Sequence, residues 1–109
     1  MKISELADKM GLTPLALPEG DREVEGFYAG DLLSWVMGRA NAGNCWFTIM
    51  NNVNVLAVAS LVDLSAVVLA EGVTLSEKDA RAALEKGINV FTSEKSTYEL
   101  CALAGELAK

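Results

Sequence analysis

From residue 45 onwards, short apolar stretches alternate with segments that have helix-like composition. Residues 45–50, 66–70 and 88–92 are almost continuously apolar, which is typical of strands buried on both faces. Val53–Val62 and Glu77–Lys86 lie between them and are predicted to be helices. Strands alternating with helices predict parallel strands joined by right-handed crossovers. The pattern predicts an α/β fold: a single compact domain with a mostly parallel sheet flanked by helices.

Polar residues stand where these helices should begin. Asn52, in the pair Asn51-Asn52, precedes the first helix, and Ser76 precedes the second. Ser96 and Glu99 form a full capping box for a last helix. Side-chain oxygens of such residues accept from free N–H groups in the first helical turn. The caps therefore support the predicted helix starts.

The first 31 residues show weaker patterns. Residues 4–10 predict a short helix that ends at Gly11. Residues 12–17 are apolar but contain Pro14, which suits an edge strand or no strand. Residues 19–21 predict a tight turn, and residues 24–29 an extended run broken by Gly26. We expect Asp31 to cap a helix that begins at residues 32–33.

Composition narrows the function classes. The chain has 109 residues, a net charge of −6 and scattered basic residues, which argues against nucleic-acid binding. Polar residues interrupt its longest apolar stretch, so no membrane association is expected. Two cysteines without an export signal favour a reducing compartment. We therefore expect one cytoplasmic domain over residues 1–109.

Candidate binding residues follow the predicted strands, because open parallel sheets bind ligands beyond the carboxyl ends of their strands. Turns and helix caps select the same residue types, and that alternative stays open. Arg22 could supply the charge for an anionic ligand, or form an ion pair with Asp21 or Asp31 that fixes the turn. The candidate ligand-binding residues are Arg22, Gly30, Asp31, Asn51, Asn52, Glu71 and Thr92.

No catalytic or metal-binding group is predicted. The chain has no histidine, which removes Ser-His and Cys-His activation and the commonest transition-metal ligand. The spacing of Cys45 and Cys101 fits no zinc pattern. Residues 38–43 have the two-glycine spacing of a phosphate loop but lack its lysine. We expect no metal, no cofactor and no enzymatic activity, with a small enzyme using clustered carboxylates as the least favoured hypothesis.

The segment Val53–Val62 is apolar almost all round, with only Asn54 and Ser60 polar. Such a helix is either buried on all sides, or its outer face contacts another copy of the protein. A domain this small can hardly enclose a helix completely, which favours a homodimer. The predicted interface residues are Val55, Val58, Ala59, Val62 and Trp35.

Several segments of the chain carry a family resemblance when they are taken together: Asp21-Arg22 with Val24 and Gly26, and residues 31–38, 46–48, 54–59, 67–72 and 87–90. In these segments the chain resembles a DRTGG domain. The resemblance implies an α/β fold similar to the N-terminal domains of HPr kinase/phosphorylase and Mur ligases. It also implies a regulatory role, since such domains accompany CBS domains, phosphate acetyltransferases or pyrophosphatases and also occur alone. Asn51-Asn52 stands where relatives often carry Thr-His, so any role of that imidazole is absent.

Two functions follow from these expectations. The first is a non-catalytic regulatory or interaction module, homodimeric, that senses a small anionic or nucleotide-like ligand. The second, suggested by the resemblance, is an accessory subunit that docks onto a redox or hydrogenase-related enzyme as its protein partner.

Overall fold

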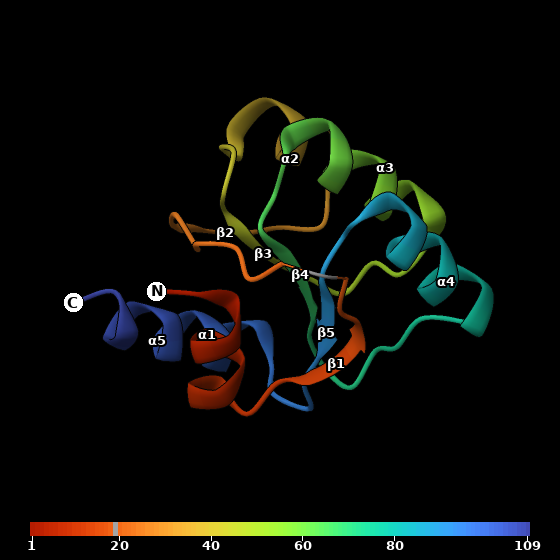
Figure 1. The fold of residues 1–109 in the computed structure, drawn as a ribbon. Coiled ribbons are helices and arrows are strands. Elements are labelled where there is room, and N and C mark those ends of the chain that lie inside the picture. The colour runs from red at the N-terminus through yellow and green to blue at the C-terminus, as the bar shows by residue number, and fades with distance from the viewer. Residues whose placement is uncertain (19) are drawn as a thin grey trace.

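One five-stranded sheet organises the chain, with the strand order β1-β5-β4-β3-β2 (Figure 1). The structure is a computed structural model that describes residues 1–18 and 20–109. The turn expected at residues 19–21 lies partly outside the described residues. In chain order the elements are α1 (Ile3–Met10), β1 (Thr13–Ala16), β2 (Phe27–Ala29), α2 (Leu33–Arg39), β3 (Cys45–Thr48), α3 (Val53–Val62), β4 (Ala66–Leu69), α4 (Glu77–Lys86), β5 (Val90–Thr92) and α5 (Thr97–Leu107).

The sheet is parallel except at one edge. Strands β2, β3, β4 and β5 run parallel, and β1 pairs antiparallel with β5. This confirms the predicted α/β class with a mostly parallel sheet. It also shows that the proline-containing segment is an edge strand, with Pro14 opposite Phe91 and an irregular register between Pro14 and Ala16.

Helices cover both faces of the sheet, with α2, α3 and α4 on one side and α1 and α5 on the other (Figure 1). Side chains alternate between the two layers along the strands. In β3, Trp46 packs into the core beneath α2 and α3, whereas Cys45 and Phe47 pack into the core beneath α1 and α5. All residues of β3 and β4 are buried, as their continuous apolar composition predicted.

Three of the four predicted caps are present. The side chains of Asn52, Ser76 and Ser96 each accept a hydrogen bond from a backbone N–H in the first turn of their helices. The fourth prediction is wrong: α2 begins after Leu32 without a side-chain cap. The carboxylate of Asp31 instead accepts hydrogen bonds from the hydroxyl of Thr48, the last residue of β3, and from the backbone N–H of Ile49, which follows β3.

Strand β2 is shorter than the predicted run. It covers Phe27–Ala29 because Gly26 has a φ of 93°, a left-handed conformation outside the extended region. A Cβ at Gly26 would lie 3.1 Å from Nδ2 of Asn44, and that amide donates to the Glu25 carbonyl at 2.7 Å. The chain therefore bends tightly against the buried Asn44 before the strand begins.

Helix α3 lies on the sheet and presents only one side to solvent. Val55, Val58 and Ala59, which were expected at a dimer interface, are buried inside the protomer, and Val62 is partly buried. A nearly uniform apolar sequence does not indicate which side faces the sheet, and this caused the error. The exposed residues of α3 are Val53, Asn54, Ala57, Ser60 and Leu61.

Candidate functional site

The carboxyl ends of the four parallel strands lie along one edge of the sheet. Six of the seven predicted ligand-binding residues follow or end these strands. Gly30 and Asp31 follow β2, and Asn51 and Asn52 follow β3. The strand exits thus carry residues able to form hydrogen bonds, as the fold class requires of a binding edge. The two remaining residues at this edge are Glu71 after β4 and Thr92 at the end of β5.

A hollow of about 520 Å³ lies at the β2 end of this edge, between β2 and α2. We call it the α2–β2 hollow. Of the predicted residues, it brings together Gly30, Asp31 and Trp35, the last of which was assigned to a dimer interface. Its lining is Tyr28, Ala29, Gly30, Asp31, Leu32, Trp35 and Arg39.

Asp31 fixes the floor of this hollow. Its Oδ1 accepts a hydrogen bond from Thr48 Oγ1 at 2.7 Å and another from the backbone N–H of Ile49 at 3.0 Å. These contacts tie the exit of β2 to the exit of β3. Among the described residues, Oδ2 of Asp31 has no hydrogen-bond partner, so the exposed carboxylate keeps one oxygen free to accept.

Trp35 and Arg39 form the wall of the hollow. The guanidinium carbon of Arg39 lies 3.7 Å from the centroid of the Trp35 ring, and Trp35 is 51% exposed. No ion pair joins Arg39 to any described residue. An exposed aromatic face beside an uncompensated guanidinium suits a planar molecule that carries negative charge.

Sequence reasoning missed Arg39. The signal was present, because residues 35 and 39 are four apart and side chains at that spacing lie on the same side of a helix.

The wall of the hollow formed by β2 is held by contacts of Gly30. Gly30 accepts from Trp46 Nε1 at 2.8 Å, and a Cβ at Gly30 would lie 3.2 Å from Cε2 of Tyr28. The Tyr28 ring therefore rests close against the main chain of Gly30.

The other residues at the strand exits have structural partners. Asn51 donates to the Thr74 carbonyl at 2.9 Å, and Asn52 caps α3. Thr92 Oγ1 contacts the Val73 carbonyl at 2.6 Å. Glu71 adopts a φ of 60° in a turn. These contacts match the alternative that turns and caps select such residues, and none of the four lines the hollow.

Arg22 lies at the other end of the strands, where β4 begins. Its Nη1 is 2.9 Å from Oδ1 of Asp63 and donates to the Leu64 carbonyl at 3.1 Å. Asp63 ends α3 in the left-handed conformation and precedes β4. The expected pairing with Asp21 or Asp31 is therefore wrong, since Arg22 anchors its loop to the end of α3. It also lies apart from the α2–β2 hollow.

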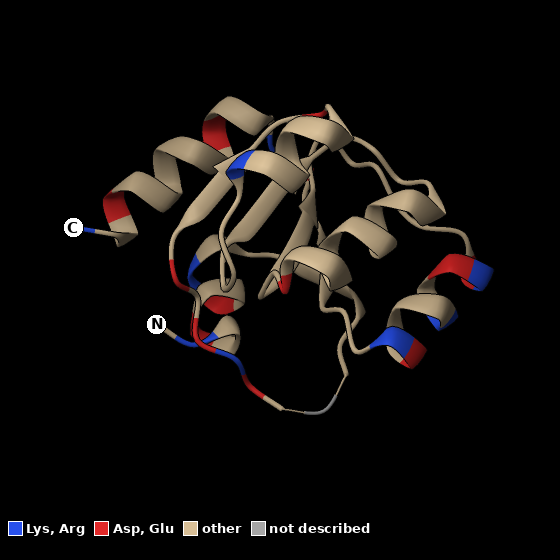
Figure 2. Ribbon diagram, turned by 90° about the horizontal axis from the view of Figure 1, so that it is seen from above, with Lys and Arg blue, Asp and Glu red and all other residues tan. Residues whose placement is uncertain are grey.

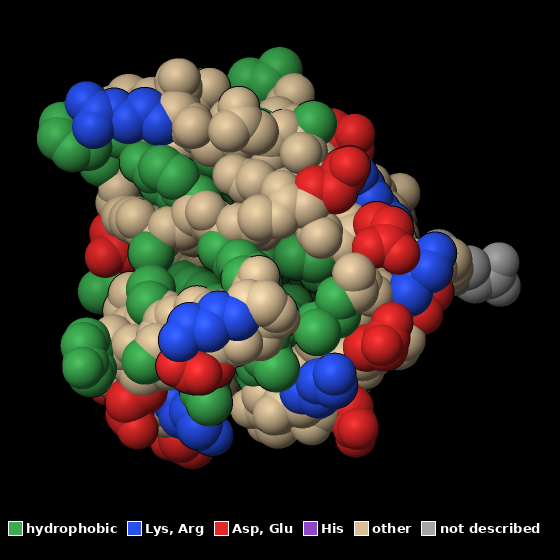
Figure 3. All heavy atoms as spheres, turned by 90° about the vertical axis from the view of Figure 1, so that its left-hand side faces the viewer, with side chains coloured by type: hydrophobic (Ala, Val, Ile, Leu, Met, Phe, Trp, Pro, Cys, Tyr) green, Lys and Arg blue, Asp and Glu red, His purple; other side chains and the backbone are tan. Residues whose placement is uncertain are grey.

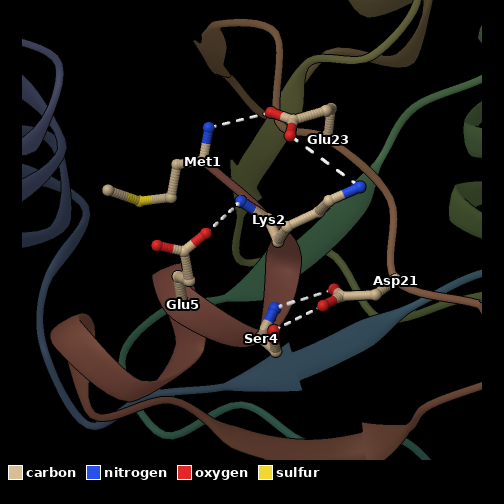
Figure 4. Close-up of polar contacts among 6 residues, drawn as sticks. All are labelled: Met1, Lys2, Ser4, Glu5, Asp21 and Glu23. Atoms are coloured by element: carbon tan, nitrogen blue, oxygen red, sulfur yellow. Dashed lines mark hydrogen bonds and ion pairs between the residues drawn. The ribbon is translucent and has the colours of Figure 1, made fainter.

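Acidic residues next to Arg22 hold the start of α1 (Figure 4). Asp21 accepts hydrogen bonds from the backbone N–H and the hydroxyl of Ser4, at 3.1 and 2.5 Å. These bonds lower the pKa of Asp21. Glu23 lies 2.8 Å from the N-terminal amine of Met1, and this hydrogen bond lowers the pKa of Glu23. The cluster thus fastens residues 21–23 to the first helix.

Charged residues lie on helices and loops around the sheet, whose strands carry none (Figure 2). Within residues 1–18 and 20–109, no three His, Cys, Asp or Glu side chains are grouped as metal ligands. Over the same residues, no helix combines the length and hydrophobicity needed to cross a membrane.

Comparison with known proteins supports the fold. No protein-family model matches the chain, and no curated protein does. A similar solved structure is the CBS and DRTGG domains of the regulatory region of Clostridium perfringens pyrophosphatase, complexed with its activator diadenosine tetraphosphate. The TM-score is 0.73 at 13% identity, over 94% of this chain and 45% of that one. The chain therefore has an α/β fold similar to part of a CBS- and DRTGG-containing regulatory region, and spans less than half of that region.

Proposed function

We propose that the chain is a DRTGG-like regulatory module without catalytic activity, which binds a small anionic, nucleotide-like ligand in the α2–β2 hollow. The observation that carries this proposal is the Trp35–Arg39 pair, an exposed ring and an unpaired cation on one wall. The similarity to a regulatory region that binds a dinucleotide activator adds support. The hollow also lies at the sheet edge where ligands bind in α/β folds.

Each wall of the hollow would recognise a different part of such a ligand. A base stacked on the Trp35 ring contributes about 1–3 kcal/mol. Arg39 can form charge-assisted hydrogen bonds to a phosphate, and the free Oδ2 of Asp31 can accept from a sugar hydroxyl. Among the described residues that line the hollow, Arg39 is the only basic one, so the attraction of an anion to this site depends on it. Binding should therefore weaken with salt.

A thermal-shift panel tests the proposal. AMP, ATP and diadenosine tetraphosphate at 100 times their dissociation constants should stabilise the fold by about 2.7 kcal/mol. Inorganic phosphate and adenosine, each lacking one half of the ligand, should give smaller shifts. Arg39→Gln and Trp35→Ala should abolish the nucleotide shift, whereas Arg81→Gln on the exposed side of α4 should not. A flat panel, or a shift that survives Arg39→Gln, would refute binding in this hollow.

The module is further proposed to act as a homodimer. The exposed side of α3 mixes Val53, Ala57 and Leu61 with Asn54 and Ser60. Apolar residues scattered in this way are ordinary on a protein surface, so α3 gives no specific support for a dimer contact. The alternative, an accessory subunit of a redox or hydrogenase-related enzyme, predicts a flat ligand panel for a protein that has the mass of a dimer.

A further inference from the structure

Strand β2 is an edge strand with one free side. Phe27, Tyr28 and Ala29 lie opposite Cys45, Trp46 and Phe47 of β3. The Gly26 carbonyl accepts from the Cys45 N–H, and the Gly30 N–H donates to the Phe47 carbonyl. Main-chain groups of alternate residues point to opposite sides of a strand.

It follows that residues 26, 28 and 30 direct their peptide groups toward β3. Phe27 and Ala29 direct theirs away from the sheet, along the free edge of β2. This leaves two N–H groups and two carbonyls at a regular spacing.

We propose that two copies of the protein pair through their β2 strands, antiparallel about a two-fold axis at Tyr28. In this register Phe27 of each copy stands opposite Ala29 of the other. Each of these two opposed pairs exchanges two N–H···O=C hydrogen bonds, so the free groups of both copies are all used. The inference rests on the homodimer of the proposed function and specifies its contact surface.

The two edges of the sheet differ in how they are protected. The opposite edge strand, β1, contains Pro14 and an irregular register, and both features discourage pairing with another chain. The sequence of β2, Phe27-Tyr28-Ala29, has no charge, proline or bulge. Only the β2 edge is thus left suited to pairing.

The surroundings of β2 provide room for a second copy. On the α5 side, a hollow of about 240 Å³ lies beside Phe27 and Ala29, and small residues of α5, Ala104, Gly105 and Ala108, form its wall. In the proposed register Phe27 of the second copy lies next to Ala29, at the mouth of this hollow. Figure 3 views the molecule from the side of β2 and the termini, and shows hydrophobic side chains in recesses between charged groups.

On the other face of the sheet, the two Tyr28 side chains meet across the axis. Tyr28 packs against the core beneath α2 and lines the α2–β2 hollow. The second copy would therefore close the open side of that hollow, and a ligand bound there would favour the dimer. Since three residues form few hydrogen bonds, most of the affinity must come from the apolar contacts on both faces.

The first test removes one outward N–H and leaves the β2–β3 pairing intact. Ala29→Pro deletes a donor that faces away from β3, a position where proline is tolerated in edge strands. Ala29→Ser is the matched control, because it keeps the N–H. We expect sedimentation equilibrium to show dimers for the wild type and Ala29→Ser, and folded monomers for Ala29→Pro. An Ala29→Pro protein that remains dimeric would overturn the inference.

A second test reports the register directly and does not depend on proline being tolerated. All variants carry Cys101→Ser, which removes the exposed thiol. Tyr28→Cys should form an intermolecular disulfide on oxidation, because residues opposed in a non-hydrogen-bonded pair have Cα atoms about 4.5 Å apart. Ala29→Cys should not form this disulfide, because residue 29 of one copy is opposite residue 27 of the other. The Cα atoms of the two residues 29 are then farther apart than the roughly 7 Å that a disulfide can span.

Equal cross-linking of the two variants would overturn the register. A monomeric wild type, with no Tyr28→Cys cross-link, would overturn the β2 contact. Ligand binding is read separately from the thermal-shift panel, so failure of the dimer contact and failure of nucleotide binding give different results.

Discussion

Replacing Arg22 by alanine should destabilise the fold without affecting ligand binding. The guanidinium contacts the Asp63 carboxylate at 2.9 Å and the Leu64 and Asp63 carbonyls at 3.1 and 3.4 Å. The side chains of Arg22 and Asp63 are 36% and 69% exposed, so solvent screens the ion pair and limits its contribution to about 0–1 kcal/mol. The hydrogen bond to the part-buried Leu64 carbonyl adds about 1 kcal/mol.

We therefore expect Arg22→Ala to lower the free energy of unfolding by about 1–2 kcal/mol, measured by urea denaturation. For a domain of this size each kcal/mol corresponds to roughly 4–8 °C in melting temperature. Asp63→Asn should remove the ion pair and keep the carbonyl contacts, so it should cost less.

A double-mutant cycle separates these contributions. Arg22→Ala combined with Asp63→Asn should be less destabilising than the sum of the two single changes, since the residues contact each other. Strict additivity, or an Arg22→Ala protein as stable as the wild type that no longer binds nucleotide, would refute the structural role given to Arg22.

Three further predictions concern other parts of the chain. The lowered pKa of Glu23 means that its contact stabilises the fold above the ordinary value of 4.5 and is lost as the pH falls below it; Glu23→Gln should flatten this part of a pH-stability curve. Burial raises the pKa of the Cys45 thiol to about 12, so a thiol reagent should label only Cys101 in the native protein and both cysteines in denaturant. Gly26→Ala should lower the free energy of unfolding, measured in urea, by about 1–3 kcal/mol, because the new Cβ would approach Asn44 and the backbone has a φ of 93°. Gly11→Ala is the control: its φ is 65° and nothing lies within 4 Å of its Cβ, so it should cost about 1 kcal/mol.

The fold could be predicted from the sequence because periodicity and caps agree from residue 45 onwards. Continuous apolar runs marked β3 and β4, and Ser96 with Glu99 marked the start of α5. These signals are local, so they predict strands and helix starts without knowledge of tertiary contacts. Pro14 likewise indicated an edge position before any pairing was known.

The errors concern contacts between segments far apart in the sequence. Asp31 stands where an N-cap would be expected, but Thr48 at the end of β3 and Ile49 just after it provide its partners. The partner of Arg22 is 41 residues away. Charge and spacing can show that such side chains need partners, but only the packing of the sheet determines which partners come within reach.

The candidate site was partly predictable for the same reason. The carboxyl edge of the sheet follows from topology, and Gly30 and Asp31 were found in this way. The choice of the β2 end over the other exits depends on how α2 packs, which exposes Trp35 and Arg39 on one wall. No local sequence pattern predicts how α2 packs.

The pairing of the first strand with the last has a consequence for synthesis of the chain on the ribosome. β1 pairs with β5, and α1 packs with α5 over the same face. β1 therefore lacks its strand partner, and α1 lacks its neighbouring helix, until the last fifth of the chain has left the exit tunnel. Until then the core cluster that contains Ile3, Leu6 and Met10 is incomplete, which leaves these residues accessible to chaperones. A ribosome paused before residue 90 should hold a protease-sensitive nascent chain, and one paused after a linker beyond residue 109 should hold a resistant domain.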